Sequence, residues 1–207
     1  MMPESIELIT ADTKFHAPYT HRVILLCLEK GIPYHITPIH LQNKPQWFLD
    51  IAPLGEVPVM RIHDQVIAGS FAIAQYLDPS LVLSAQDAET LRRIDQFGHE
   101  LVLFCRQRKN TIADLAHLNT FLTTFNAQLA KRPYLSGDAA TYLDFALIPH
   151  ILQIDDFETL VFPFSMLAKH QNLSAWFERM MERPSVQTSS ENHARYFIEH
   201  LQHRGLL

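Results

Sequence analysis

Cysteine is scarce in this chain of 207 residues, which contains only Cys27 and Cys105. Two cysteines cannot build a disulfide framework, and neither belongs to a Cys-x-x-Cys pair. Both lie in apolar patterns of helical spacing, so we expect buried thiols in a reducing compartment and predict a cytoplasmic location. The twelve histidines are scattered. His200 and His203 have helical i, i+3 spacing, but two ligands do not complete a zinc site. We therefore predict no metal centre.

Long apolar runs and an excess of positive charge are also missing. The longest apolar runs are only a few residues, as at 23–28, whereas spanning a bilayer needs about 20. Lysine and arginine number 17 against 22 aspartates and glutamates, a formal net charge of −5. A general nucleic-acid-binding protein would carry a basic surface instead. The first residues lack the basic and apolar regions of a signal peptide. We expect neither a membrane nor a nucleic acid as partner.

Hydrophobic residues make up 47% of the chain and charged residues 19%, which indicates a globular protein with a buried core. Its first part alternates strand-like and helix-like segments. The pattern predicts strands at 6–10 and 34–39, with a helix between them that opens at Pro18 and stops at Gly31. A strand, a helix and a second strand in this order indicate a parallel pair with a right-handed crossover.

A short helical or irregular segment that opens at Lys44 and then a hairpin are predicted next. The hairpin comprises runs at 57–62 and 65–68, joined by the two-residue turn His63-Asp64. Ser70 is predicted to cap the helix that follows. This part of the chain therefore has the element order β-α-β-α-β-β-α.

Beyond about residue 85 the pattern is helical throughout. Ser84-x-x-Asp87 and Thr141-x-x-Asp144 have the spacing of helix-capping boxes. We predict two domains: an α/β domain at residues 1–80 and an all-helical domain at residues 85–207. The predicted helices of the second domain span approximately 84–109, 112–130, 145–154, 173–181 and 192–203.

Motifs spread through nearly the whole chain carry a resemblance to one family. They are APYTHRV at 17–23, PLGEVPV at 53–59, GS at 69–70, TYLDFA at 141–146 and NLSAWFER at 172–179. In these motifs, and in an α/β half followed by an all-α half, the chain resembles the glutathione transferase superfamily. The segment KPQWF at 44–48 most resembles the omega class. The resemblance implies a thioredoxin-like N-terminal domain plus an all-α C-terminal domain.

The resemblance also implies a glutathione site along the N-terminal domain. At matching positions, Lys44 would contact the glycyl end of glutathione, and the backbone of Val57 would pair with its cysteinyl backbone. Pro58 would be cis and would hold that edge open. Ser70, at a helix N-terminus, would bind the γ-glutamyl carboxylate. The alternative roles are a plain helix cap for Ser70 and a solvated surface lysine for Lys44.

Two positions depart from the family's pattern. Gly69 replaces an acidic residue that helps to hold the γ-glutamyl group, which should weaken binding about ten- to a hundredfold. Ala17 replaces the catalytic serine or cysteine, so neither a hydrogen bond to the thiolate nor a mixed disulfide can form there. The helix N-terminus at Pro18 would still lower the pKa of a nearby thiol. His16 and Tyr19 are candidate substitute donors; the alternatives are a loop histidine and a packing aromatic.

Two functions from different classes stay open. The retained positions favour an enzyme, a glutathione transferase of omega-like ancestry that binds glutathione as co-substrate and joins it to a small hydrophobic electrophile. Ala17 and Gly69 favour a non-catalytic member that acts through protein contacts, as the stringent starvation proteins do. We favour the glutathione-binding interpretation. We also expect a homodimer, because family members usually pair about a two-fold axis.

Overall fold

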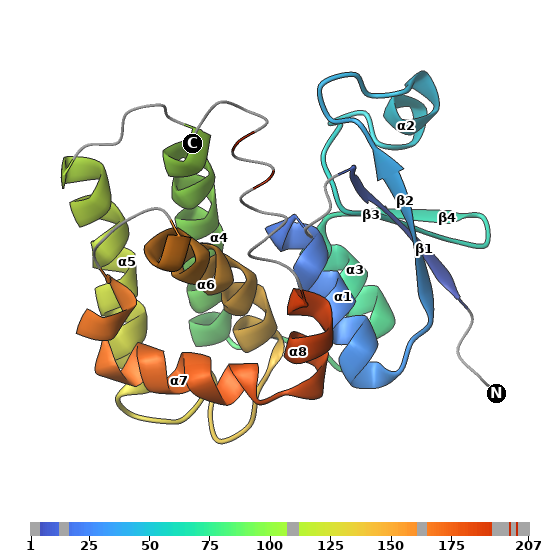
Figure 1. Cartoon of the computed structure of the whole chain (residues 1–207). Helices are drawn as coiled ribbons and strands as arrows, with labels where there is room; N and C mark the ends of the chain where they lie inside the picture. The colour runs from blue at the N-terminus through green and yellow to red at the C-terminus, as the bar shows by residue number, and fades with distance from the viewer. Residues whose placement is uncertain are drawn as a thin grey trace. The chain divides into compact units, whose positions relative to one another are not determined.

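The chain divides into two compact units, Met1–Val82 and Leu83–Leu207, which are drawn in Figure 1 from a computed structural model. Each unit has its own buried core. The residues that the structure describes are 5–12, 17–106, 112–160, 165–191, 199 and 202.

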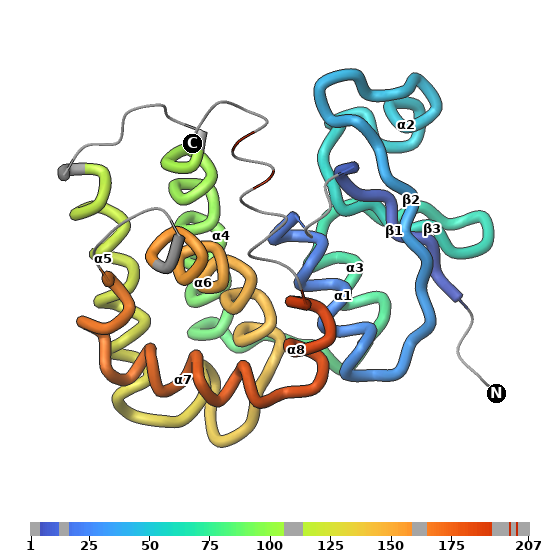
Figure 2. Tube along the Cα trace, viewed as in Figure 1, coloured from blue at the N-terminus to red at the C-terminus, as the bar shows by residue number. Residues whose placement is uncertain are grey.

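The first unit contains a four-stranded sheet in the order β2-β1-β3-β4. Strands β1 (Ile6–Ala11) and β2 (Tyr34–Ile39) run parallel and are joined by helix α1 (Pro18–Lys30). Strands β3 (Val59–Ile62) and β4 (Gln65–Ala68) form an antiparallel hairpin, and β3 also pairs antiparallel with β1. The Cα trace in Figure 2 shows the same path. The predicted element order, parallel crossover and two-residue hairpin turn are confirmed.

Alternation along the strands explains why helices cover both faces of this sheet. Successive strand residues point to opposite faces. Leu8 packs with side chains of α1 and of α3 (Ser70–Leu77), whereas the next residue, Ile9, packs with Phe48 of α2 (Gln46–Ile51) on the other face. All three of these side chains are fully buried, and each such burial stabilises the fold by about 1.5–3 kcal/mol.

Helix α1 begins and ends where the sequence predicted. Pro18 occupies its first turn, and Gly31 ends it with a φ of 63°, a conformation that glycine adopts without strain. Buried Thr20 of α1 shares a hydrogen bond of 2.7 Å with Thr10 of β1 through their hydroxyl oxygens. This bond ties the first turn of α1 to the end of β1.

In the second unit the described residues form helices and their connections. Phe97, Phe125 and Trp176 are among its largest fully buried side chains. None of the described helices is both long and apolar enough to cross a membrane. The helices are α4 (Ala85–Arg106), α5 (Ile112–Leu129), α6 (Tyr142–Leu160), η1 (Leu167–Lys169), α7 (Gln171–Met181) and α8 (Pro184–Ser190).

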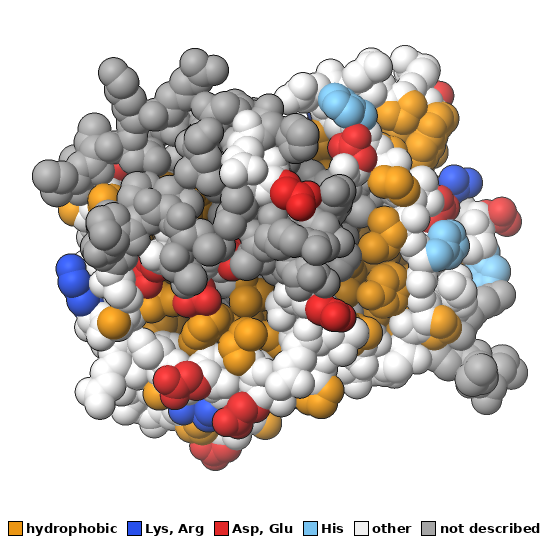
Figure 3. Space-filling view, viewed as in Figure 1, with side chains coloured by type: hydrophobic (Ala, Val, Ile, Leu, Met, Phe, Trp, Pro, Cys, Tyr) orange, Lys and Arg blue, Asp and Glu red, His pale blue; other side chains and the backbone are white. Residues whose placement is uncertain are grey.

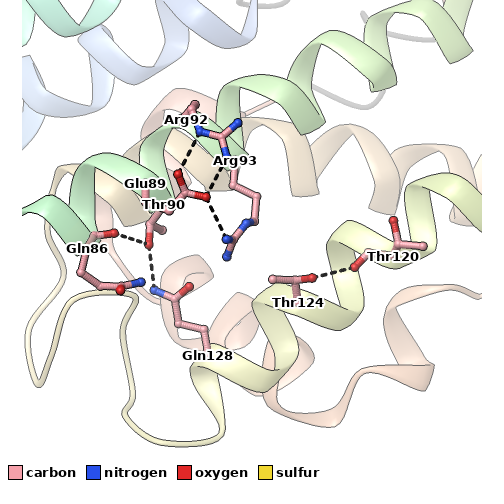
Figure 4. Close-up of polar contacts among 8 residues, drawn as sticks. All are labelled: Gln86, Glu89, Thr90, Arg92, Arg93, Thr120, Thr124 and Gln128. Carbon is pink, nitrogen blue, oxygen red and sulfur yellow. Dashed lines mark hydrogen bonds and ion pairs between the residues drawn. The ribbon is translucent and has the colours of Figure 1, made fainter.

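Polar contacts lie along α4 and between α4 and α5 (Figure 4). Glu89 pairs with Arg92 at 2.7 Å and with Arg93 at 3.0 Å, on the surface of α4. Gln128 of α5 donates a hydrogen bond of 3.3 Å to the Thr90 hydroxyl of α4. Exposed ion pairs contribute only about 0–1 kcal/mol to stability, whereas Phe97 of α4 packs against Phe121 and Phe125 of α5.

Each predicted capping box forms one of its two reciprocal hydrogen bonds. The Asp87 amide donates to the Ser84 hydroxyl at 3.1 Å, and the Thr141 amide donates to the Asp144 carboxylate at 2.8 Å. Asp144 is buried and also accepts a hydrogen bond of 2.8 Å from the Trp176 indole. Burial raises the pKa of Asp144, while its hydrogen bonds act in the opposite direction. Asp144 therefore ties the start of α6 to α7.

Three helical expectations need correction or fall outside the described residues. Helix α6 is longer than the predicted 145–154, and Pro149 lies inside it. Helix α8 was not predicted; it begins at Pro184, and proline favours the first turn of a helix. Of the helix predicted at 192–203, only residues 199 and 202 are described, and both are helical.

Candidate functional site

The predicted site positions of the first unit all adjoin one edge of its sheet. Parallel strands β1 and β2 end together there, since Ala11 lies opposite Ile39. Strand β3 begins and β4 ends at the same edge, because Val59 lies opposite both Ile9 of β1 and Ala68 of β4. Connections at this edge therefore converge, although they are far apart in the sequence. The positions that follow or precede these strand ends are Ala17, Lys44, Val57, Pro58, Gly69 and Ser70.

A hydrogen bond joins two of the predicted segments directly. The Gly69 amide donates to the Pro58 carbonyl oxygen at 3.0 Å. The Val57–Pro58 peptide bond is cis, as predicted. Pro58 is buried and Val57 half-buried. Within the described residues, no backbone hydrogen bond uses the N–H or C=O of Val57, so both groups are open to an extended ligand backbone.

Ser70 is the first residue of α3 and not its cap, which corrects the prediction from the sequence. Gly69 holds the N-cap position with φ 93° and ψ 134°, outside the helical region, and it has no side chain to cap the helix. Ser70 is 7% exposed, and its hydroxyl makes no hydrogen bond to any described residue. The first turn of α3 therefore offers an unused hydroxyl together with uncapped N–H groups, which suit a carboxylate.

Lys44 lies in the connection between β2 and α2 and is half-buried. Its ammonium forms no ion pair or hydrogen bond with any residue that the structure describes. The lysine side chain lies against Gly55, which belongs to the connection that follows α2. Gly55 lies within the motif PLGEVPV, and its φ of 65° is the feature that requires a glycine.

Ala17 occupies the N-cap position of α1 and makes no side-chain cap. Its carbonyl accepts a hydrogen bond of 2.8 Å from the His21 amide, so the helix starts immediately after it. Of the candidate donors, His16 lies outside the described residues. Tyr19 is half-buried, with the Arg22 guanidinium 4.4 Å from its ring centroid. A thiol at this helix start would meet backbone N–H groups and the positive end of the helix dipole.

Hydrophobic side chains gather over α2, at the end of the first unit that carries this helix (Figure 3). We call this surface the α2 patch. The exposed large apolar side chains on α2 and beside it in the sequence are Leu54 (85% exposed), Trp47 (42%) and Leu41 (36%). Exposed apolar residues that are grouped rather than scattered are typical of interaction surfaces.

Neither cysteine offers a substitute nucleophile in the first unit. Burial raises the pKa of Cys27 to about 12, so its thiol stays protonated at neutral pH. Cys105 belongs to the second unit and is half-buried. The described residues contain no group of three or more histidine, cysteine, aspartate or glutamate side chains that could hold a metal ion.

A small depression lies between α4 and α5 of the second unit. Its volume is about 60 Å³, whereas sites for drug-sized ligands occupy about 300–1,000 Å³. This depression is therefore too small to hold such a ligand. It is lined by Glu100, Leu103, Phe104, Asp114, His117 and Leu118.

Family comparisons agree with this architecture. The family model described as "Glutathione S-transferase, N-terminal domain" matches residues 16–79, and "Glutathione S-transferase, C-terminal domain" matches residues 111–184. The chain belongs to the glutathione S-transferase superfamily. Its predicted omega-like character and its fold, a thioredoxin-like domain plus an all-α domain, are confirmed.

Three curated relatives illustrate the similarity. Glutathione S-transferase DHAR2 of Arabidopsis thaliana is 30% identical over 156 residues, covering 70% of each chain. Mouse glutathione S-transferase omega-1 is 26% identical and covers 89% of this chain and 80% of its own. The probable glutathione S-transferase DHAR2, chloroplastic, of Oryza sativa is 31% identical over 72% of this chain, which spans only 56% of that relative's length.

Solved structures show the same fold. Rice GST1 in complex with glutathione has a TM-score of 0.78 and 19% identity, and the match covers 94% of this chain and 97% of that one. Glutathione transferase Omega 3C from Trametes versicolor has a TM-score of 0.69 and 22% identity, covering 89% and 88% of the two chains. At these identities the likeness establishes the fold alone.

Proposed function

We propose that this protein binds glutathione along the sheet edge of its first unit. One observation carries the proposal: three predicted contacts each have hydrogen-bonding groups that no described residue uses. They are the backbone of Val57, the hydroxyl of Ser70 and the ammonium of Lys44. Because these groups have no hydrogen-bond partner among the described residues, they are available to a ligand.

The chemistry of the tripeptide matches this set of groups. Its γ-glutamyl carboxylate would accept hydrogen bonds from Ser70 and from the first N–H groups of α3. Its cysteinyl backbone would pair with Val57, in the manner of an added strand. Its glycyl carboxylate would meet the ammonium of Lys44. The thiol would then lie toward Ala17, at the N-terminus of α1.

We further propose that the bound thiol is conjugated to a small hydrophobic electrophile. The thiol loses its proton to solvent, the thiolate attacks, a sulfur–carbon bond forms and the leaving group departs with its electron pair. The N-terminus of α1 lowers the thiol pKa, and binding positions the sulfur. Ala17 contributes no hydroxyl or thiol, so thiol exchange at this position is excluded and conjugation is expected to be slow.

Ala17 is also the observation that favours the second candidate function. A member of the superfamily without this donor could act through protein contacts alone, with the α2 patch as a contact surface. Under that function the unused groups of Ser70 and Lys44 would be surface features with no ligand.

We also propose a cytoplasmic homodimer with domains at residues 1–80 and 85–207. The exposed α2 patch, with Leu54 at 85% exposure, supports burial against a second copy. Sedimentation at micromolar concentration would then give about twice the chain mass of 23.8 kDa. A mass of one chain across that range would refute the dimer.

Calorimetric titration with glutathione tests the proposed function. We expect the parent protein to bind, and Ser70→Ala to weaken binding about tenfold, because one hydrogen bond to a charged group is lost. Ser80→Ala is the matched control: its hydroxyl bonds to Asp78 within the protein, so affinity should not change. If the parent binds no glutathione at millimolar concentration, the transferase function falls and the protein-contact function takes its place.

A further inference from the structure

The side chain of Lys44 lies directly over the backbone of Gly55. A Cβ atom placed on Gly55 would be 3.0 Å from Lys44 Nζ, 3.1 Å from Cδ and 3.2 Å from Cε. Three neighbouring atoms of the lysine side chain therefore lie beside the position that a Cβ atom of residue 55 would occupy. A Cβ atom at position 55 would make the lysine side chain shift by a few tenths of an ångström.

The backbone holds Gly55 in a fixed place beneath the lysine. Gly55 is buried, its φ is 65°, and its amide donates a hydrogen bond of 2.8 Å to the Ala52 carbonyl. Ala52 and Phe48 of the α2 segment are themselves buried in the core on that face of the sheet. The surface on which Lys44 rests is therefore part of the packed structure.

The ammonium that this surface supports has no partner among the described residues. Gly55 is also only two residues before Val57, whose backbone groups are open. A lysine stem that is already laid along the protein loses less side-chain freedom when its ammonium meets an anion.

We propose that Gly55 is a positioning residue: its missing side chain lets Lys44 lie where its ammonium meets the glycyl carboxylate of glutathione. This inference rests on the proposed function and adds a residue that acts only through Lys44. Ordering one long side chain beforehand is expected to raise affinity about three- to tenfold.

The test measures glutathione affinity in Gly55→Ala by calorimetry. Alanine at Gly55 introduces two effects, displacement of Lys44 and strain at positive φ. Gly31→Ala is a matched control for strain, because Gly31 has a φ of 63° and no atom within 4 Å of its Cβ position. We expect Gly55→Ala to weaken glutathione binding about three- to tenfold and Gly31→Ala to leave it unchanged.

A second ligand distinguishes positioning from a general structural effect. Glutathione esterified on its glycyl carboxylate lacks the charge that Lys44 would meet. We expect Gly55→Ala to bind this ester as well as the parent protein does. In a Lys44→Met background, Gly55→Ala should cause no further loss for either ligand, because the group that it positions is absent.

Each contrary result has a separate meaning. If the parent binds no glutathione, the proposed function and this inference both fail. If the parent binds and Lys44→Met weakens binding, but Gly55→Ala matches Gly31→Ala, the function stands and the positioning role is wrong. Equal losses for glutathione and its ester in Gly55→Ala would also overturn the positioning role.

Discussion

The Gly69 amide donates a hydrogen bond of 3.0 Å to the Pro58 carbonyl oxygen. This bond fixes the start of α3 against the segment that precedes β3, so Ser70 and Val57 are placed by the same backbone contact. The contact needs no side chain at Gly69, whose φ of 93° is in the region where glycine is favoured. A change at Gly69 is therefore expected to act on stability and on the proposed glutathione site together.

Gly69→Glu should increase glutathione affinity and decrease stability. A carboxylate restored at this position would accept a hydrogen bond from the γ-glutamyl amino group, for a gain of about tenfold or more. The positive φ would cost about 1–3 kcal/mol in the free energy of unfolding. Calorimetric titration and thermal melting measure the two effects. Gly69→Ala is the control, since it adds the strain without the carboxylate; equal affinities for the two variants would contradict the prediction.

Ala17→Ser should raise conjugation about tenfold or more, with little change in glutathione affinity. A hydroxyl beside the sulfur favours the thiolate by about 1–3 kcal/mol through hydrogen bonding. Steady-state kinetics with a thiol-reactive aryl halide measure the effect. Serine at the N-cap also stabilises α1 by about 0.5–2 kcal/mol. Ala17→Asp controls for this, because aspartate caps the helix without donating to a thiolate; it should melt higher than the parent but gain no rate.

Ala17→Cys should create thiol-exchange activity. A cysteine at a helix N-terminus has a lowered pKa and can form a mixed disulfide with glutathione. Mass spectrometry of the oxidised variant should show one added glutathione on residue 17, and reduction of a mixed-disulfide substrate should become measurable. A variant that binds glutathione as the parent does but forms no adduct would show that Ala17 does not lie beside the sulfur.

Asp155→Asn should stabilise the second unit at neutral pH. Burial raises the pKa of Asp155, and the charges of Asp156 and Glu158 raise it further. The folded chain therefore holds this proton more tightly than the unfolded chain does, and the stability contributed by the group is lost as pH rises through its folded pKa. We expect the variant to melt about 1–2 °C above the parent at pH 7.

This stabilisation should shrink as the pH falls through the raised pKa of folded Asp155, and it should vanish below about pH 4, the pKa of an unfolded aspartate. Thermal melting across pH 3–7 measures the difference. Asp138→Asn, at an exposed position of the same unit, should show no such trend. A melting difference that stays constant with pH would rule out relief of charge repulsion.

Local signals in the sequence predicted most of the first unit. The proline and glycine that bound α1, and the turn between β3 and β4, act through backbone conformation alone, so they can be recognised without tertiary contacts. Strand β3 is shorter than the run at 57–62, because Pro58 has no N–H to donate. Serine is a common N-cap residue, but here Gly69 holds the N-cap position and Ser70 is the first helical residue. Residue type alone does not distinguish these two positions.

The candidate site was less accessible to sequence reasoning. The motifs indicated which residues would contact glutathione. The strand register, seen only in the structure, explains why these residues lie at the same edge of the sheet. The contact of Lys44 with Gly55 is a tertiary contact between the segments that precede and follow α2. Residue spacing does not predict such a contact, so the positioning role proposed for Gly55 could be inferred only from the structure.

Helices α1 and α3 both begin without a side-chain cap. The first N–H groups of these helices therefore have no side-chain acceptor at the N-cap position. A tripeptide with its sulfur at the start of α1 and a carboxylate at the start of α3 would supply acceptors for the first N–H groups of both helices. Ligand and fold would then be linked: at a hundred times its dissociation constant, glutathione would add about 2.7 kcal/mol to stability, and the amides of these two turns would be where hydrogen exchange slows most.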